Sequence, residues 1–358
     1  MMASPRKKRL MVKEIFLIGA GFNIEANAYV FGQGRTTGLS AQCMHANAPS
    51  WERLLVPSRY PLVGDLRRTC FGPDAPTDVS VEGLFQAAYS LHDWVPLHRL
   101  AEIISAGDHY IGAPLAKRGN TAYAAFLESF PEADYLSFNY DSLIEFHLRV
   151  RNRWNPCEGF GLHAETKKTR VSSHYSETEL ASSQIVLHLH GSLCLSPIES
   201  DIHSAPPGGL PMLTLREHPR LIFDPESLAG DFAPYQVPDL EPGYIQPVSR
   251  FVPPIPGKEE GLEQDYYRIL LARAHDLVGV AQRLTAIGYS FAPSDSGSYH
   301  DILLKLFKAK KELVIVGPEA EECSVRLSRE FETFRPRIRP ISVTFGSWVR
   351  AGFPGVKS

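Results

Sequence analysis

The sequence predicts an α/β protein built on an open, Rossmann-like parallel sheet with helices on both faces. Two observations predict this class. Short, nearly continuous apolar runs recur along the chain, as expected for strands buried on both faces. Segments with apolar residues at helical spacing lie between these runs, so that strands and helices alternate.

The predicted strands are short apolar runs that end near a glycine or a small polar residue. They are residues 14–18, 133–137, 184–189, 284–288 and 312–316, with a further strand at 340–344. The helical patterns fall between and around them, at 80–91, 97–106, 120–130, 140–150, 261–282, 296–309 and 320–332. The longest helix, 261–282, has Tyr267, Leu270 and Ala274 on one face.

The chain divides into a short leader and one domain. Residues 1–13 contain the basic run Arg6–Arg9 and are expected to be a flexible leader. Residues 14–358 form the domain, with a helical insertion at about 36–130 after the first strand–helix unit. Residues 195–258 are so rich in proline that we expect neither long helices nor central strands there. This segment is either a small subdomain or a lid over the pocket.

The composition is that of a globular protein and excludes several function classes. Of 358 residues, 44% are hydrophobic and 22% charged, and the net charge is −3. Without a basic field, we expect neither direct nucleic-acid binding nor attraction to a membrane surface. No stretch reaches the roughly 18 apolar residues of a membrane span, and the leader lacks the features of a secretory signal.

The cysteines argue against a disulfide framework and against a zinc module. There are five, an odd number, and none forms a Cys-x-x-Cys pair. We therefore expect no four-cysteine zinc site and no other metal site. This cysteine usage fits a reducing cytoplasm, where such residues act mainly as small buried side chains.

The first motif directly follows the first strand and consists of Gly19, Ala20, Gly21, Phe22 and Asn23. Glycine lacks a Cβ, so the chain can turn sharply and present N–H groups to a phosphate at a helix start. By itself the motif fits a tight structural turn equally well. Ala26 would have to serve as the third small residue of a dinucleotide fingerprint. No acidic residue ends a second strand about 20 residues later, which counts against a dehydrogenase.

The second and third motifs also stand at predicted strand ends. Asn139 and Asp141 follow the second strand, at the sheet edge where α/β proteins bind ligands, although either could simply cap the next helix. Strand alternation puts His188 and His190 on one face, and His190, beside Gly191, is better placed to face a ligand. A buried core histidine is the alternative. Zinc binding by the pair lacks an evident third ligand.

The fourth motif consists of Gly288, Tyr289 and Ser290, with Asp295 beyond. The glycine would let a nucleotide approach the backbone, and the Ser290 hydroxyl could donate to a phosphate or a ribose. Gly317 follows the next strand, where an adenosine could lie.

Taken in order, the four motifs resemble those of the sirtuin-like family, most closely the prokaryotic sirtuin-like NAD hydrolases of antiphage defence. They read Gly-Ala-Gly-Phe at 19–22, Phe-Asn-Tyr-Asp-x-Leu-Ile-Glu at 138–145, His-x-His-Gly-Ser at 188–192 and Ile-Gly-Tyr-Ser at 287–290. The resemblance implies that 14–358 is an NAD-binding domain, that NAD+ is the substrate, and that zinc is not needed. It implies catalytic roles for Asn139 and His190, with Asp141 ordering the loop.

The resemblance further implies that the remaining motif residues bind NAD+. They are Gly19, Ala20, Gly21, Phe22, Asn23, Gly288, Tyr289, Ser290, Asp295 and Gly317. The expected reaction is NAD+ glycohydrolysis to nicotinamide and ADP-ribose, in a cytoplasmic effector that depletes NAD+ during abortive infection. A homo-oligomer and an activating or assembling protein partner are expected as well.

Two alternatives stay open. One is a sensor of NAD+ or ADP-ribose that gates a partner without turnover, and the other is an NAD-dependent protein deacylase. The chain lacks the Gly-Ile-Pro-Asp-Phe-Arg segment and the zinc module of deacetylase sirtuins, and it has Ser137-Phe138-Asn139-Tyr140-Asp141 where they have Thr-Gln-Asn-Ile-Asp. These departures favour nicotinamide cleavage over deacetylation.

Overall fold

The computed structural model describes the sheet and its helices but not the segments inserted between them. The described residues are 13–23, 25–26, 115–139, 141, 143–154, 159–160, 164–166, 183–191, 195–197, 221–223 and 265–356. The predicted leader up to residue 12, the helices predicted at 80–91 and 97–106, and the insertion as far as residue 114 lie outside these residues. So do four of the five cysteines. The fifth, Cys323, is buried.

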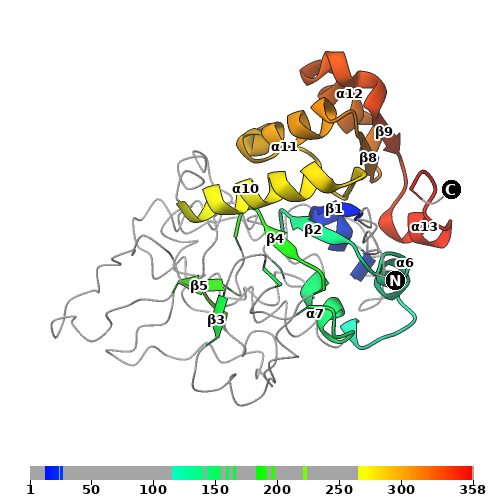
Figure 1. Cartoon of the computed structure of the whole chain (residues 1–358). Coiled ribbons are helices and arrows are strands. Elements are labelled where there is room, and N and C mark those ends of the chain that lie inside the picture. Colours follow the sequence, from blue (N-terminus) through cyan, green and yellow to red (C-terminus); the bar gives the residue numbers. More distant parts are fainter. Residues whose placement is uncertain are drawn as a thin grey trace, which may run out of the picture.

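A six-stranded parallel sheet forms the centre of the fold (Figure 1). Its strands are β1 (Ile15–Ile18), β2 (Asp134–Ser137), β4 (Val186–His188), β7 (Arg283–Ile287), β8 (Glu312–Val316) and β9 (Ile338–Ile341). Their spatial order is β4-β2-β1-β7-β8-β9. This is the Rossmann order, in which the chain builds outward from β1 in one direction and then returns to build outward from β7. The predicted α/β class is confirmed.

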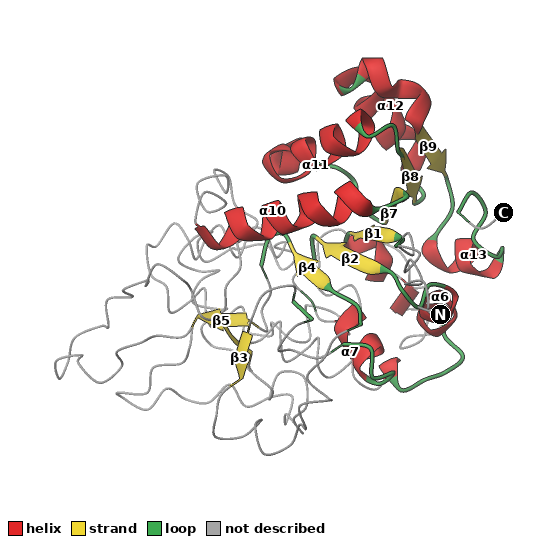
Figure 2. Cartoon of the chain, in the orientation of Figure 1, coloured by secondary structure: helices red, strands yellow, loops and turns green. Residues whose placement is uncertain are grey.

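Helices cover both faces of this sheet, as predicted. They are α6 (Ala122–Ser129), α7 (Leu143–Arg149), α10 (Asp265–Val280), α11 (Ser296–Lys308), α12 (Ala320–Glu330) and α13 (Phe345–Arg350). Figures 1 and 2 show α10, α11 and α12 on one side of the sheet, and α6, α7 and α13 on the other. The strands between these two layers, except the edge strand β9, are almost wholly buried, which explains their nearly continuous apolar runs.

The carboxyl-terminal part of the chain differs from the sequence-based prediction. The strand predicted at 340–344 lies at Ile338–Ile341, and Thr344 instead caps α13. The Thr344 side chain accepts a hydrogen bond from the Ser347 N–H at 3.3 Å, which favours helix over strand. The helix α13 was not predicted, yet it carries Trp348, which is fully buried and packs edge-on against Phe353 at 5.0 Å.

A second, three-stranded sheet contains two strands from the proline-rich segment. It consists of β3 (Ala164–Thr166), β5 (Leu195–Pro197) and β6 (Leu221–Phe223), in the order β3-β6-β5. The prediction that prolines exclude central strands from 195–258 is therefore wrong at β6. This strand contains no proline, whereas β5 ends on Pro197 at a sheet edge, where the missing N–H is tolerated.

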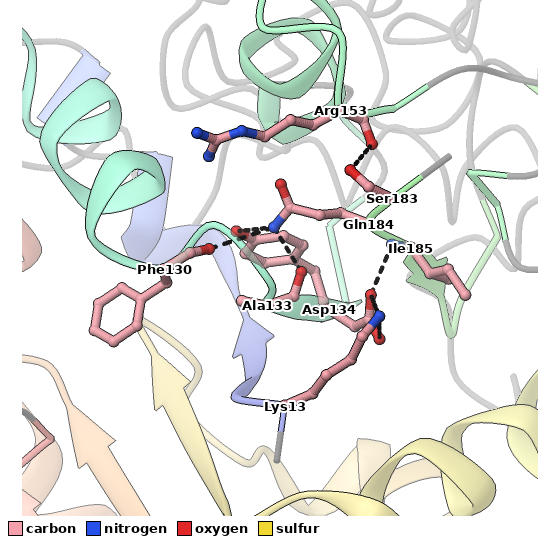
Figure 3. Close-up of polar contacts among 9 residues, drawn as sticks. Lys13, Phe130, Ala133, Asp134, Arg153, Ser183, Gln184 and Ile185 are labelled. Carbon is pink, nitrogen blue, oxygen red and sulfur yellow. Dashed lines mark hydrogen bonds and ion pairs between the residues drawn. The ribbon is translucent and has the colours of Figure 1, made fainter. Parts of the chain in front are cut away.

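A polar cluster ties together the amino-terminal ends of β1, β2 and β4 (Figure 3). Asp134 accepts hydrogen bonds from Lys13 Nζ at 3.1 Å and from the Ile185 N–H at 2.9 Å. Gln184 Nε2 donates to the Ala133 carbonyl at 2.6 Å. Burial raises the pKa of Asp134, and the charge of Lys13 opposes that shift. This cluster lies at the sheet edge opposite to the one that carries the four motifs.

His147 of α7 is a buried histidine whose surroundings predict a pH effect. It is fully buried against Tyr123, with the ring centroids 5.0 Å apart. Within the described structure neither ring nitrogen has a hydrogen-bond partner. Burial lowers the pKa of His147 to about 3, with a smaller contribution from the positive charge of Arg151.

We expect His147 to make the fold sensitive to acid. Between its native pKa of about 3 and the ordinary value of about 6.5, the unfolded chain binds a proton that the native state does not. The contribution of His147 to the free energy of unfolding is therefore complete above pH 6.5 and decreases as the pH drops. We expect the free energy of unfolding to fall by about 2 kcal/mol between pH 7 and pH 5. Urea unfolding at both pH values, on the wild type and His147→Leu, measures it. A wild type and variant that lose equal stability over this range would contradict the prediction.

Candidate functional site

The four motifs begin at the same edge of the main sheet because the strand ends are in register. Ile18 pairs with Ser137 on one side and with Ile287 on the other. Ser137 pairs in turn with His188. Ile287 pairs with Val316, which precedes Gly317. The strand order reverses between β1 and β7, so the first and fourth motifs flank the point where open α/β sheets bind ligands.

The first motif packs directly against the fourth. The N–H of Gly21 donates to the Gly288 carbonyl at 2.8 Å, and the N–H of Gly19 donates to the Ile287 carbonyl at 3.1 Å. Gly288 has a φ of +60°, and a Cβ there would lie 2.3 Å from the backbone of Gly21 and Phe22. Glycine is therefore required here for the close approach of two chain segments.

This packing changes the explanation of the glycine turn. The prediction rests on N–H groups that face a phosphate, but those of Gly19, Gly21 and Phe22 donate to protein carbonyls. Ala20 and Gly21 are half-buried, in the 3-10 helix η1 (Ala20–Asn23). Binding of a pyrophosphate at this turn stays a prediction.

The second motif is hydrogen-bonded to the first. Asn139 Nδ2 donates to the Gly19 carbonyl at 3.1 Å. Asp141 Oδ2 accepts from Asn23 Nδ2 at 2.5 Å, and its Oδ1 accepts from the Leu143 N–H at 3.0 Å. Asp141 thus accepts from the first residue of α7, in line with the helix-cap alternative, and also holds Asn23 of the glycine turn. Asn139 and Asp141 are both buried.

The two histidines of the third motif face different helices. His190 Nε2 lies 3.3 Å from the Ser298 hydroxyl of α11, whereas His188 contacts Glu145 of α7. The prediction that they share one face is wrong, because β4 ends at His188 and the chain then turns through Gly191 at a φ of +80°. His190 is buried, and its ring meets that of Phe138 edge-on at 4.9 Å.

Aromatic rings connect the third motif to the fourth. Phe138 stacks on Tyr289 with centroids 4.2 Å apart, and the Tyr289 hydroxyl donates to Asp295 Oδ2 at 2.9 Å. Burial and the Asp295 carboxylate together hold the pKa of Tyr289 well above its usual value. Tyr289 and Asp295 therefore pack with each other, beneath Phe138, at the sheet edge.

Ser290 and Gly317 lie farther along this edge. The Ser290 residue is exposed, and its carbonyl accepts hydrogen bonds from Arg326 and from the Cys323 thiol. Gly317 is buried, and a Cβ placed on it would lie 4.0 Å from Gly288. Both positions are compatible with the predicted nucleotide site, and their roles stay predictions.

Sequence reasoning missed the partnership of Glu145 with His188. Both side chains are fully buried, and His188 Nε2 is hydrogen-bonded to Glu145 Oε1. His188 Nδ1 lies 2.8 Å from the Asn139 carbonyl. Burial opposes charge on His188, but the charge and hydrogen bond of Glu145, the hydrogen bond to the Asn139 carbonyl and the charge of Asp141 together outweigh it, and the pKa of His188 is raised. The one available signal was Glu145 itself, an acid between the apolar residues Ile144 and Phe146.

The solved structures that are similar to this chain include three from work on Sir2 enzymes and a Sir2 homologue. One is from work on the mechanism and regulation of Sir2 enzymes; it has 14% identity and a TM-score of 0.40, and covers 97% of this chain and 93% of its own. Two are mutants of a Sir2 homologue in complex with ADP-ribose, with 14% identity and TM-scores of 0.38 and 0.39, covering 95% of this chain and 90% of theirs. No protein-family model and no curated protein matches the chain.

Across the described ranges, no group of three or more His, Cys, Asp or Glu side chains is arranged to hold a metal ion. In the same part of the chain, no helix is both long and apolar enough to cross a membrane.

Proposed function

We propose that this protein is a sirtuin-like NAD+ hydrolase, with residues 14–358 as its NAD-binding domain. The observation that carries the proposal is the hydrogen bond from Asn139 Nδ2 to the Gly19 carbonyl. It joins the carboxamide of the second motif to the glycine turn, beside the point where the strand order reverses. Motifs far apart in the sequence thus meet where a dinucleotide would bind.

The proposed reaction breaks the bond between ribose C1′ and the nicotinamide nitrogen. Nicotinamide leaves as a neutral molecule from a cationic precursor, so the site mainly orients the substrate and stabilises an oxocarbenium-like state. Asn139 holds the ribose hydroxyls or the attacking water. His190 accepts a proton from that water or from a ribose hydroxyl, the usual role of a histidine in general base catalysis. Water oxygen bonds to C1′, and the products are nicotinamide and ADP-ribose.

The cellular role follows from the resemblance and belongs to the same proposal. Hydrolysis would deplete NAD+ in an infected cell, as in abortive infection, and a protein partner or homo-oligomerisation would control it. The buried positions of Asn139 and His190 agree with a site that needs an activating change before substrate reaches it.

Incubation of the purified protein with NAD+ tests the proposal. We expect nicotinamide and ADP-ribose to accumulate together, measured by chromatography. The NAD+ content of cells that express the protein is followed during phage infection in parallel, so that an enzyme activated only by infection is detected as well.

Other outcomes identify the alternatives. A melting shift with ADP-ribose but no nicotinamide in either assay would indicate a sensor. Acyl-ADP-ribose formed from an acyl-lysine peptide would indicate a deacylase. The absence of both ADP-ribose binding and NAD+ turnover would contradict an NAD-linked function altogether.

A further inference from the structure

His188 is a buried bridge between α7 and the backbone of the second motif. Its Nε2 is hydrogen-bonded to Glu145 Oε1, and its Nδ1 lies 2.8 Å from the Asn139 carbonyl oxygen. The Asn139 carbonyl can only accept a hydrogen bond, and the Glu145 carboxylate is likewise an acceptor when it is ionised. The contacts therefore require that Nδ1 carry a proton, which it donates to the Asn139 carbonyl.

The pair can hold its remaining proton in two ways with the same result. Either His188 is an imidazolium beside a Glu145 carboxylate, or it is a neutral imidazole that accepts a hydrogen bond from a carboxylic acid. Nδ1–H is donated to the Asn139 carbonyl in both states. The other titratable group acting on His188 is Asp141, whose negative charge also favours the imidazolium, and the Phe160 ring lies 6.0 Å away.

Asn139 is held by four hydrogen bonds, and the pair supplies one of them. The Asn139 N–H donates to the Ser137 hydroxyl at 3.1 Å, and its side-chain amide donates to the Gly19 carbonyl. Its carbonyl accepts from His188 at 2.8 Å and, at the longer distance of 3.4 Å, from the Ser137 hydroxyl. With the backbone held in place, the hydrogen bond from the side-chain amide to the Gly19 carbonyl then fixes the direction of the carboxamide. A shift of about 1 Å in such a group can cost about a hundredfold in rate.

We propose that Glu145 and His188 are positioning residues, which act through the backbone of Asn139 to aim its carboxamide at the substrate ribose. This inference rests on the proposed function for its kinetic consequence. The structural part, a fixed Asn139 backbone, stands on the contacts alone. Both side chains are fully buried, and they reach the site through the Asn139 carbonyl that His188 contacts.

Two replacements of Glu145 separate positioning from packing. Glu145→Gln keeps the shape and can donate to Nε2 of a neutral His188, which leaves Nδ1–H on Asn139. Glu145→Leu fills similar volume but leaves Nε2 buried without a partner, so the ring is no longer held in one tautomer. We expect Glu145→Leu to lower kcat for NAD+ by about tenfold or more, with KM within about threefold, and Glu145→Gln to recover most of that loss.

Hydrogen exchange provides a readout that does not depend on activity. We expect the amides of Asn139 and Leu143 to exchange at least about tenfold faster in Glu145→Leu than in the wild type, and Glu145→Gln to match the wild type. The matched control is Asp134→Asn. It alters another buried carboxylate, which lies at the end of β2 opposite to Asn139. It should change neither kcat nor exchange at Asn139.

The outcomes distinguish this inference from the proposed function. If the wild type releases no nicotinamide but exchange rises in Glu145→Leu alone, the proposed function fails and the positioning of Asn139 stands. Equal kcat and equal exchange in Glu145→Leu and Glu145→Gln would overturn the positioning role. So would an Asp134→Asn variant that loses as much kcat as Glu145→Leu, because the loss would then reflect general destabilisation.

Discussion

Replacement of His190 by alanine is expected to lower nicotinamide release from NAD+ by at least about a hundredfold, the usual contribution of a general base. The imidazole stands just beyond the end of β4 and contacts Phe138 and Ser298. Asn139→Ala should have a comparable effect, because it removes the carboxamide that joins the second motif to the Gly19 turn. Steady-state assays of nicotinamide release measure both.

The control for this prediction is another buried histidine. His147→Leu changes a fully buried imidazole on α7 that is not among the proposed site residues, and it should keep nicotinamide release within about threefold of the wild type. Binding of ADP-ribose, followed by the shift of the melting temperature, checks that His190→Ala still forms the pocket. Wild-type turnover in both His190→Ala and Asn139→Ala would refute the assignment of these two residues.

The second large effect is expected from Gly288→Ala, which should destabilise the fold by about 3 kcal/mol. Two causes add. The φ of +60° is unfavourable for any residue with a Cβ, and that Cβ would lie 2.3 Å from the backbone of Gly21 and Phe22. These atoms belong to the turn itself and cannot move aside like the end of a flexible side chain. Thermal unfolding should show a decrease in melting temperature of about 4 °C.

Gly352→Ala separates the two causes. Gly352 also has a positive φ, +76°, but a Cβ there would have nothing within 4 Å. We expect it to cost only about 1 kcal/mol, the penalty of the backbone conformation alone. If the two variants melt at the same temperature, the close contact between Gly288 and the first motif does not contribute to stability.

The elements that sequence reasoning located share one property: their pattern is local. The strands β1, β7 and β8 could be located because both of their faces are covered, so that each is a nearly continuous apolar run. The helix α13 was missed because six residues are too few to display helical periodicity. The prediction that His188 and His190 share one face was wrong because side chains alternate between faces only within a strand, and β4 ends at His188.

In the candidate site, too, the features with a local pattern could be predicted and the long-range contacts could not. Glycines and polar residues at the ends of strands could be recognised because a parallel sheet must bring those ends to one edge. Which side chains pair there could not be read, since Glu145 and His188 lie 43 residues apart and meet only when α7 packs beside β4.

The order of strand-forming and helix-forming segments, and the residue types at the strand ends, follow from the amino-acid pattern alone, because both depend on near neighbours in the chain. The close packing of Gly288 on Gly21, the Asn139 contact with Gly19 and the buried Glu145–His188 pair depend on folding. Each joins segments that are far apart in the chain, and burial then sets the hydrogen bonds and pKa values of the groups they contain.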